Sequence, residues 1–346
     1  MYKRQEETYN ISLESLKESY ERLLKKRKKV SAVIAVSLFG LPAHLKEIKN
    51  FCKEKGIYFI EDICQAFGAK IGNKKVGTFG IASATSFYPT KPFSTFGDAG
   101  MVFTSNKKIA KKVKFLKEHG QTKPYFYKYH GINGRIDEIH SAILLTKFKY
   151  FEKEIALGKA IVEKYIEGLK DLNPYLKLPY FPKNYFSSYS LFTIRVKNRN
   201  KLKEFLDRQG VGTGIYYSKP LHLQPIYKNL NFKNGDLPIT EKLAKEVLSL
   251  PLHPYLTEEE IKKLGIEREF WMHPLKKEDE ILVSEHIWRD KGGEYFMRSQ
   301  YALELPLEEV LRPDGYVYWV PNYVVKSPRE CKSIIIDPKN LKYRVL

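Results

Sequence analysis

Four side chains with distinct chemistry lie within the segment from residue 59 to residue 100. They are the carboxylate of Asp62, the amide of Gln65, the hydroxyl of Ser86 and the amine of Lys91. The segment closes with the glycine-containing run "STFGDAG". Together these groups could hold a pyridine ring that carries a phosphate, because such a ring needs an acid, an amide, a hydroxyl and an amine around it.

Lys91 lies between Pro89 and Pro92, which stiffen the backbone on both sides. A lysine that forms a Schiff base must be held in place and partly desolvated, so that its amine loses a proton near neutral pH. The rigid flanks favour this role. The alternative is an exposed surface charge, because the chain contains 60 Lys and Arg residues.

Asp62 and Gln65 supply a carboxylate and an amide to one pocket. An aspartate beside a ring nitrogen keeps that nitrogen protonated and makes the ring an electron sink, while an amide can bind the ring hydroxyl. Ser86, five residues before Lys91, offers a hydroxyl to a phosphate. The alternatives are a turn-forming aspartate after a strand and an ordinary polar position within a strand.

Alternating strand and helix patterns must position these residues. Ser12 is expected to cap a helix over residues 13–26, and the apolar runs "SAVIAVSLFG" and "IYFIED" predict strands on either side of a helix in "PAHLKEIKNFCKEKG". This order predicts a right-handed crossover and a mostly parallel sheet covered on both faces, an α/β fold. Asp62 then ends a strand, at the edge where ligands bind in such sheets.

Three regions are expected along the chain. Residues 1–150 form a large domain, with further strands at "SATSFYP" and "AGMVFTS" and a basic helix over 107–119. A long helix over 137–169 leads into a small α+β domain, residues 151–265, with strands at "YSLFTIRV" and "VGTGIYY" around a helix. Residues 266–346 are aromatic and β-prone, which predicts a β-rich C-terminal appendage.

Composition narrows the function classes. The net charge of +20 could attract nucleic acid, but the lysines are spread over the predicted helices, so a solvated basic surface is favoured. No membrane span or export signal is indicated, which predicts a cytoplasmic protein. The widely spaced cysteines, Cys52, Cys64 and Cys331, predict free thiols and no metal site.

Seven motifs together resemble those of the pyridoxal-phosphate-dependent nucleotide-sugar aminotransferases, the DegT family, in the family's order and spacing. They are "IEDICQAFGA", "NKKVGTFG", "SFYPTK", "FGDAGMVFTSN", "GINGRIDEIHSAILL", "KPLHLQPIY" and "LPLHPYLTEEEI". The resemblance covers about residues 7–264. It implies the fold type I architecture of aspartate aminotransferases and pyridoxal 5'-phosphate as cofactor.

The resemblance also implies the role of each site residue. Lys91 would form the Schiff base and move protons, Asp62 would pair with the ring nitrogen, Gln65 would contact the ring hydroxyl, and Ser86 would bind the phosphate. Asn133 would reach the cofactor phosphate of the neighbouring subunit in a homodimer, with Arg135 and Asp137 organising that interface; the alternative for these two is helix capping and a surface ion pair. Tyr217 and His222 are expected to line the sugar cleft or to build a turn.

The implied reaction moves an amino group from an amino acid, usually glutamate, to a keto-sugar carried on a nucleotide, for surface polysaccharide or glycan synthesis. Two elements of the family, an amino-terminal phosphate-binding loop and an aromatic residue that stacks on the ring, are not found, so bare apolar surface is expected on the large domain. A catalytically inactive or truncated homologue, acting as a binding or regulatory module, is therefore the alternative.

Overall fold

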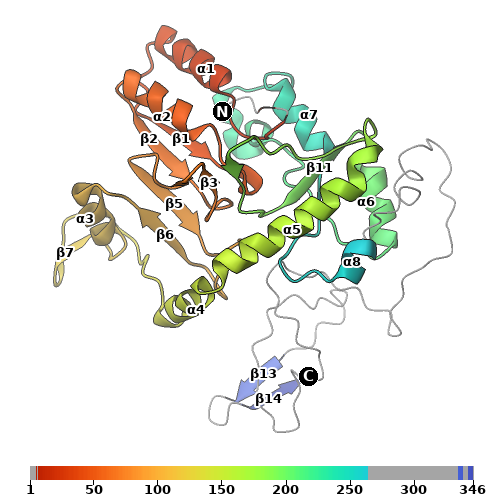
Figure 1. Cartoon of the computed structure of the whole chain (residues 1–346). Helices are drawn as coiled ribbons and strands as arrows, with labels where there is room; N and C mark the ends of the chain where they lie inside the picture. The colour runs from red at the N-terminus through yellow and green to blue at the C-terminus, as the bar shows by residue number, and fades with distance from the viewer. Residues whose placement is uncertain (1–4, 6, 264–333, 338–341, 346) are drawn as a thin grey trace.

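The computed structural model describes residues 5, 7–263, 334–337 and 342–345 (Figure 1). Its first half is built on a four-stranded sheet in the order β1 (Ala32–Val36), β2 (Tyr58–Asp62), β5 (Ala82–Ser86) and β6 (Gly100–Phe103). The first three strands are parallel and β6 is antiparallel to β5. The mostly parallel α/β sheet predicted from the sequence is therefore confirmed.

Two helices, α1 (Leu13–Lys25) and α2 (Leu45–Glu54), pack on one face of this sheet. The Ser12 hydroxyl accepts a hydrogen bond from the Ser15 amide (3.2 Å), which confirms the expected helix cap. Leu16 of α1 and Ile48 of α2 are fully buried against Val33 of β1. Apolar residues spaced by three and four thus join both helices to the strands.

The opposite face of the sheet is open among the described residues. Ile34 and Val36 of β1 are 57% and 40% exposed, and Tyr58 of β2 is 62% exposed. The expectation that helices cover both faces is therefore wrong for this face, although parallel strands are normally buried on both. The bare apolar surface expected from the sequence lies here.

A buried carboxylate anchors the chain that connects β2 to β5. This connection contains β3 (Lys70–Ile71) and β4 (Lys74–Lys75), which pair with each other, and β3 also pairs with β10 (Tyr185–Phe186). Glu61 of β2 is buried and accepts hydrogen bonds from the amides of Gly77 (2.7 Å), Phe79 (2.6 Å) and Gly80 (2.7 Å). Glu61 thereby fixes the turn that leads into β5.

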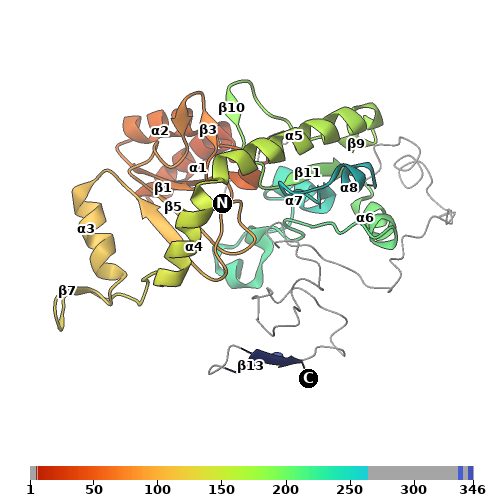
Figure 2. The same ribbon diagram turned by 60° about the horizontal axis from the view of Figure 1, so that its bottom comes forward.

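An arm projects from the sheet after β6. It contains the basic helix α3 (Lys107–Leu116), which buries none of its residues, and the hairpin of β7 (Gln121–Lys123) and β8 (Phe126–Tyr127). Both views place the arm at the far side of the molecule from α6 (Arg199–Arg208) (Figures 1 and 2). The Asn106 side chain caps α3 by accepting from the amides of Lys108 (2.9 Å) and Ile109 (3.2 Å).

The long helix expected over 137–169 is two helices, so that prediction is wrong in its centre. They are α4 (Glu138–Phe148) and α5 (Phe151–Leu169), which meet at an angle in Figure 2. At the junction the amides of Lys149 and Tyr150 bond to carbonyls three residues earlier, which tightens the end of α4. Neither glycine nor proline marks this break, so the sequence pattern does not reveal it.

The second half surrounds an antiparallel sheet in the order β12 (Val247–Leu250), β11 (Phe192–Val196) and β9 (Leu176–Lys177). Helix α5 joins the two halves, because Phe151 lies in the core behind the Lys91 loop while Tyr165 lies in the core of this sheet. The remaining helices are α6 (Arg199–Arg208), α7 (Pro238–Glu246), α8 (Glu258–Lys263) and 3₁₀ turns at Leu38–Gly40 (η1), Lys170–Leu172 (η2), Leu221–Leu223 (η3) and Pro225–Leu230 (η4).

One strand prediction in this half is wrong. The segment "VGTGIYY" contributes only an isolated bridge between Gly214 and Ser249, and β12 occupies the place beside β11. All four residues of β12 are buried, whereas the glycines at 212 and 214 offer no side chain to pack. Burial therefore selects the later segment as the strand.

The predicted C-terminal appendage, residues 266–346, lies mostly outside the described residues. Within it the structure describes one antiparallel hairpin, β13 (Ile334–Asp337) with β14 (Lys342–Val345). Across the described parts of the chain, we find no helix whose length and apolar character would let it traverse a bilayer.

Candidate active site

The carboxyl ends of β2 and β5 bring Asp62 and Ser86 to one edge of the sheet. Asp62 pairs with Ala84 of β5, and Ser86 follows two residues later, so both side chains belong to the open face. Asp62 Oδ1 accepts from the Cys64 amide (3.0 Å), and Ser86 Oγ accepts from the Tyr88 amide (3.2 Å). The turn-forming role considered for Asp62 is thus present, and it fixes the carboxylate at the site.

Both Asp62 and Lys91 influence the pKa of Cys64. Burial raises the pKa of the Cys64 thiol to about 12, and the hydrogen bond and negative charge of Asp62 add to this rise. The positive charge of Lys91 acts on the same pKa in the opposite direction. The opposite charges of Asp62 and Lys91 therefore both influence this thiol. Sequence reasoning passed over Cys64, although its position two residues after Asp62 was the available signal.

The loop that carries Lys91 is firmly packed. Lys91 itself is half-buried, and the following residues, 92–95, are buried. The Lys91 amide donates to the Tyr88 carbonyl (2.9 Å), and the Thr95 amide donates to the Phe87 carbonyl (2.8 Å). In the described part of the chain, no hydrogen bond or ion pair engages the Lys91 amine. Its backbone is fixed while its Nζ stays available for chemistry.

Gln65 connects the sheet edge to the second half of the chain. Its Oε1 accepts from the amide of Phe39 (2.8 Å), and its Nε2 donates to the hydroxyl of Tyr217 (3.4 Å). Tyr217 follows the segment "VGTGI" and is half-exposed. The structure therefore brings two of the residues predicted from the sequence, Gln65 and Tyr217, into contact beside Asp62.

Asn133 lies elsewhere, on the arm. It forms an isolated bridge with Glu118 and is exposed, and Arg135 nearby contacts the His119 ring (3.3 Å). Asp137 occupies the N-cap position of α4 without a side-chain capping bond. This placement does not join Asn133 to Asp62 and Lys91 within one chain, so its predicted role toward a neighbouring subunit stays a prediction.

His222 is buried rather than facing a cleft. Its side chain is 2% exposed, and its Nε2 lies 2.9 Å from Glu241 Oε1. Glu241 also accepts from the amides of Gly235 (2.8 Å) and Leu237 (3.1 Å). These hydrogen bonds lower the pKa of the Glu241 carboxyl against the opposing effect of burial, which is the largest single influence on it. His222 therefore stabilises the loop behind Tyr217, as the structural alternative proposed, and its position does not support contact with a sugar.

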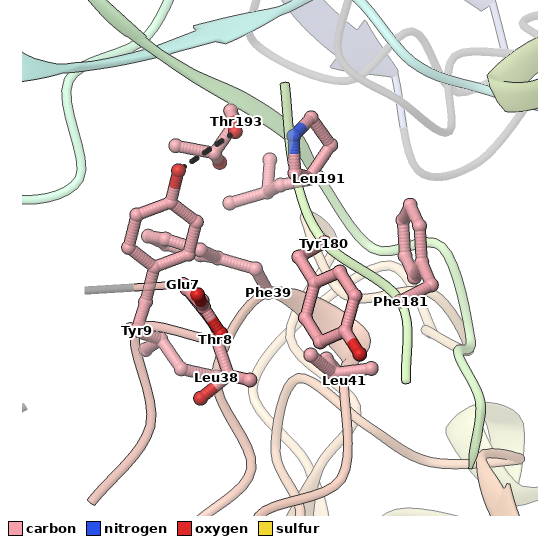
Figure 3. A pocket seen from close by; sticks show the side chains of 11 residues that line it. Glu7, Thr8, Tyr9, Leu38, Phe39, Leu41, Tyr180, Phe181, Leu191 and Thr193 are labelled. Carbon is pink, nitrogen blue, oxygen red and sulfur yellow. Dashed lines mark hydrogen bonds between the residues drawn. The ribbon is translucent and has the colours of Figure 1, made fainter. Parts of the chain in front are cut away.

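A small pocket lies between residues 7–9, the η1 turn and the segment that leads into β11 (Figure 3). Its walls are mostly apolar and include Phe39, Tyr180 and Leu191, and the Tyr9 hydroxyl donates across one end to the Thr193 carbonyl (3.3 Å). None of Asp62, Gln65, Ser86 and Lys91 lines it. Because it lacks basic residues, this pocket does not suit a phosphate.

The model of the DegT/DnrJ/EryC1/StrS aminotransferase family matches residues 4–266. The chain belongs to this family. Its relatives include the UDP-2-acetamido-2-deoxy-3-oxo-D-glucuronate aminotransferase of Pseudomonas aeruginosa, which is 36% identical over 74% of this chain and 68% of the relative. A pleiotropic regulatory protein of Geobacillus stearothermophilus is 38% identical over 71% of this chain and 66% of the relative.

Solved structures of the DegT/DnrJ/EryC1/StrS family share the fold. A family aminotransferase from Brucella abortus superposes with a TM-score of 0.74 at 37% identity, over 78% of this chain and 72% of the other. The S. venezuelae protein DesV, solved with a ketimine intermediate, gives a TM-score of 0.72 at 28% identity, over 80% and 72% of the two chains. This chain spans about two thirds of the length of the curated relatives it matches.

Proposed function

We propose that this protein is a pyridoxal-phosphate-dependent aminotransferase that moves an amino group from an amino acid, glutamate in particular, to a keto-sugar carried on a nucleotide. Family membership supports the reaction type. The observation that supports the proposal for this chain is the strand register that puts Asp62 and Ser86 on one face at the carboxyl edge of the sheet, with the packed loop of Lys91 following five residues after Ser86.

The side chains at this edge suit the cofactor. The Asp62 carboxylate would hold the ring nitrogen protonated, Gln65 would bind the ring hydroxyl through its amide, and Ser86 would donate its hydroxyl to the phosphate. When bound, the cofactor supplies an electron sink for the carbon that loses or gains a proton. The open face beside Asp62 and Ser86 leaves room for a flat ring.

Lys91 is the proposed catalytic residue. Its amine would carry the cofactor covalently and would then move a proton at the substrate carbon in both halves of the reaction. The packed loop limits the positions that Nζ can reach, which favours proton transfer at one defined atom. Tyr217 would contact the sugar substrate, because this residue is half-exposed and its hydroxyl lies beside Gln65.

A homodimer with shared active sites is part of this proposal. Large apolar side chains are exposed on α4 and on the loop before it, including Ile132, Ile139, Leu145 and Phe148. Such side chains on neighbouring elements are typical of a protein interface. Asn133 lies within the same region. In a dimer formed through these side chains, the Asn133 amide of one subunit would lie near the cofactor phosphate of the other.

The product would enter surface polysaccharide or glycan synthesis, and a cytoplasmic location stays a prediction from composition. The alternative, an inactive homologue acting as a binding module, is not favoured, because relatives are named as sugar-nucleotide aminotransferases and Lys91 is retained. Absorbance of the protein loaded with pyridoxal phosphate tests the proposal. L-glutamate should convert the cofactor to its aminated form with release of 2-oxoglutarate; no change in the native protein would contradict transamination.

A further inference from the structure

A lysine of α4 holds the loop that carries Lys91. The Lys147 ammonium donates to the Ser94 carbonyl (2.8 Å) and lies 3.1 Å from the Ser94 hydroxyl. Ser94 itself is 1% exposed and Lys147 is partly buried, so these contacts are partly shielded from water. A bond to a backbone carbonyl fixes the path of the chain and not merely the rotamer of one side chain.

A second contact comes from the same face of α4. The Nδ1 atom of His140 lies 3.0 Å from the Thr95 hydroxyl, and its ring lies against Gly97. His140 and Lys147 are seven residues apart, or about two helical turns, so both face the loop. Side chains of helix α4 therefore contact the loop at two consecutive residues, Ser94 and Thr95.

Aromatic packing also holds the loop, through Phe93. The Phe93 ring is buried and lies 4.9 Å from the ring of Phe151 and 5.7 Å from that of Phe148, measured between centroids. With Phe93 pointing into this cluster, the segment after Lys91 has little freedom to turn. Apolar packing alone accounts for the position of Phe93. It does not explain why a charged side chain, Lys147, contacts the next residue, Ser94.

The burial of Lys147 is energetically unfavourable. Desolvation lowers the pKa of its ammonium, and the carboxylate of Glu154 acts in the opposite direction. A buried charge is retained where its hydrogen bonds compensate for the lost water. The bonds to Ser94 provide this compensation and tie the charge to the loop.

We propose that Lys147 is a positioning residue, which fixes residues 92–95 from α4 and thereby directs the Lys91 amine toward the edge that holds Asp62. His140 supports it through Thr95. The inference rests on the proposed function, because it assigns Lys147 a task only if Lys91 is the reactive amine. In this proposal Lys147, which lies outside the sheet edge, acts through the Lys91 loop and does not touch the cofactor.

Hydrogen exchange in the cofactor-free protein provides the first test. Lys147→Met keeps the length of the side chain but removes its charge and hydrogen-bond donors, whereas Lys147→Arg keeps the charge and the donors. The control, Lys149→Met, removes an exposed lysine two residues further on. Exchange of the Thr95 amide should rise about tenfold in Lys147→Met, return at least about halfway in Lys147→Arg, and stay unchanged in the Lys149→Met control. Equal exchange in all variants would overturn the inference.

The second test measures the reactivity of Lys91 itself. Each variant is mixed with pyridoxal phosphate, reduced with borohydride at timed intervals, and mapped for the adduct on Lys91. The adduct should form about tenfold more slowly in Lys147→Met than in Lys149→Met, with partial rescue by arginine. If the native protein forms no adduct, the proposed function fails. If the native protein and the Lys147→Met variant react equally fast, only the positioning role fails.

Discussion

The side chains of Gln65 and Tyr217 meet across the two halves of the chain, with 3.4 Å between Nε2 and the hydroxyl. Gln65 follows β2 of the large sheet, whereas Tyr217 belongs to a loop next to β12. The same glutamine also accepts from the Phe39 amide (2.8 Å). One residue thus connects the predicted cofactor edge, η1 and the predicted substrate loop.

Tyr217→Phe removes the hydroxyl but keeps the ring. The bond to Gln65 is long and exposed, so the free energy of unfolding should change by less than about 0.5 kcal/mol. If the hydroxyl contacts the sugar, KM for the keto-sugar nucleotide should rise about fivefold while the reaction with glutamate stays unchanged. Steady-state kinetics measure the KM for the keto-sugar nucleotide and the reaction with glutamate. Tyr227→Phe, in the same region, is the control, and an equal KM in the two variants would remove Tyr217 from the sugar site.

Glu61→Gln should destabilise the large domain. An amide can supply one acceptor oxygen where the carboxylate now receives three backbone amides, so a buried N–H would lose its partner. The expected loss is about 3 kcal/mol of unfolding free energy, measured by urea denaturation. Glu54→Gln, at an exposed residue paired with Lys55 at 3.5 Å, should cost little unfolding free energy. Equal midpoints for the two variants would rule out an anchoring role for Glu61.

Cys64 should resist alkylation at ordinary pH. Burial, and then Asp62, disfavour the thiolate and raise the pKa to about 12, so the thiol stays protonated well above pH 8. Iodoacetamide at pH 8 should modify it at least about a hundredfold more slowly than free glutathione, with the rate rising as pH approaches 11. Peptide mapping separates Cys64 from Cys52 and Cys331. Reaction of Cys64 at the rate of a free thiol would show that the site is not built as described.

The sequence predicted the strand ends well. Asp62 was placed at a strand end because parallel strands carry their ligands at the carboxyl edge, and the strand–helix–strand order is legible from apolar runs. Ser86 was singled out by its hydroxyl and its position five residues before Lys91. For His222 the sequence left open a role in the sugar cleft or in a structural turn, because its burial depends on Glu241, nineteen residues later, and sequence spacing does not show that pairing. Lys147 was overlooked for a related reason: in a lysine-rich chain, only the fold distinguishes a partly buried ammonium from a solvated one.

Subunit complementation tests the proposed sharing of active sites. Lys91→Ala and Asn133→Ala should each be inactive alone, because one lacks the amine and the other lacks the phosphate contact from the neighbouring subunit. After the two proteins are mixed and allowed to exchange subunits, about a quarter of native activity should return, since half of the dimers then contain one intact site. Mixed variants that stay inactive, despite proven subunit exchange, would place Asn133 outside the partner's site.

The most direct measurement is the identity of the lysine that carries pyridoxal phosphate. The native protein is incubated with a stoichiometric amount of pyridoxal phosphate, reduced with borohydride and digested, and the modified peptide is identified by mass spectrometry. The account predicts one dominant adduct on Lys91, which is lost in Lys91→Ala and weakened in Asp62→Ala. An adduct spread over surface lysines, or a dominant adduct on another lysine, would contradict it.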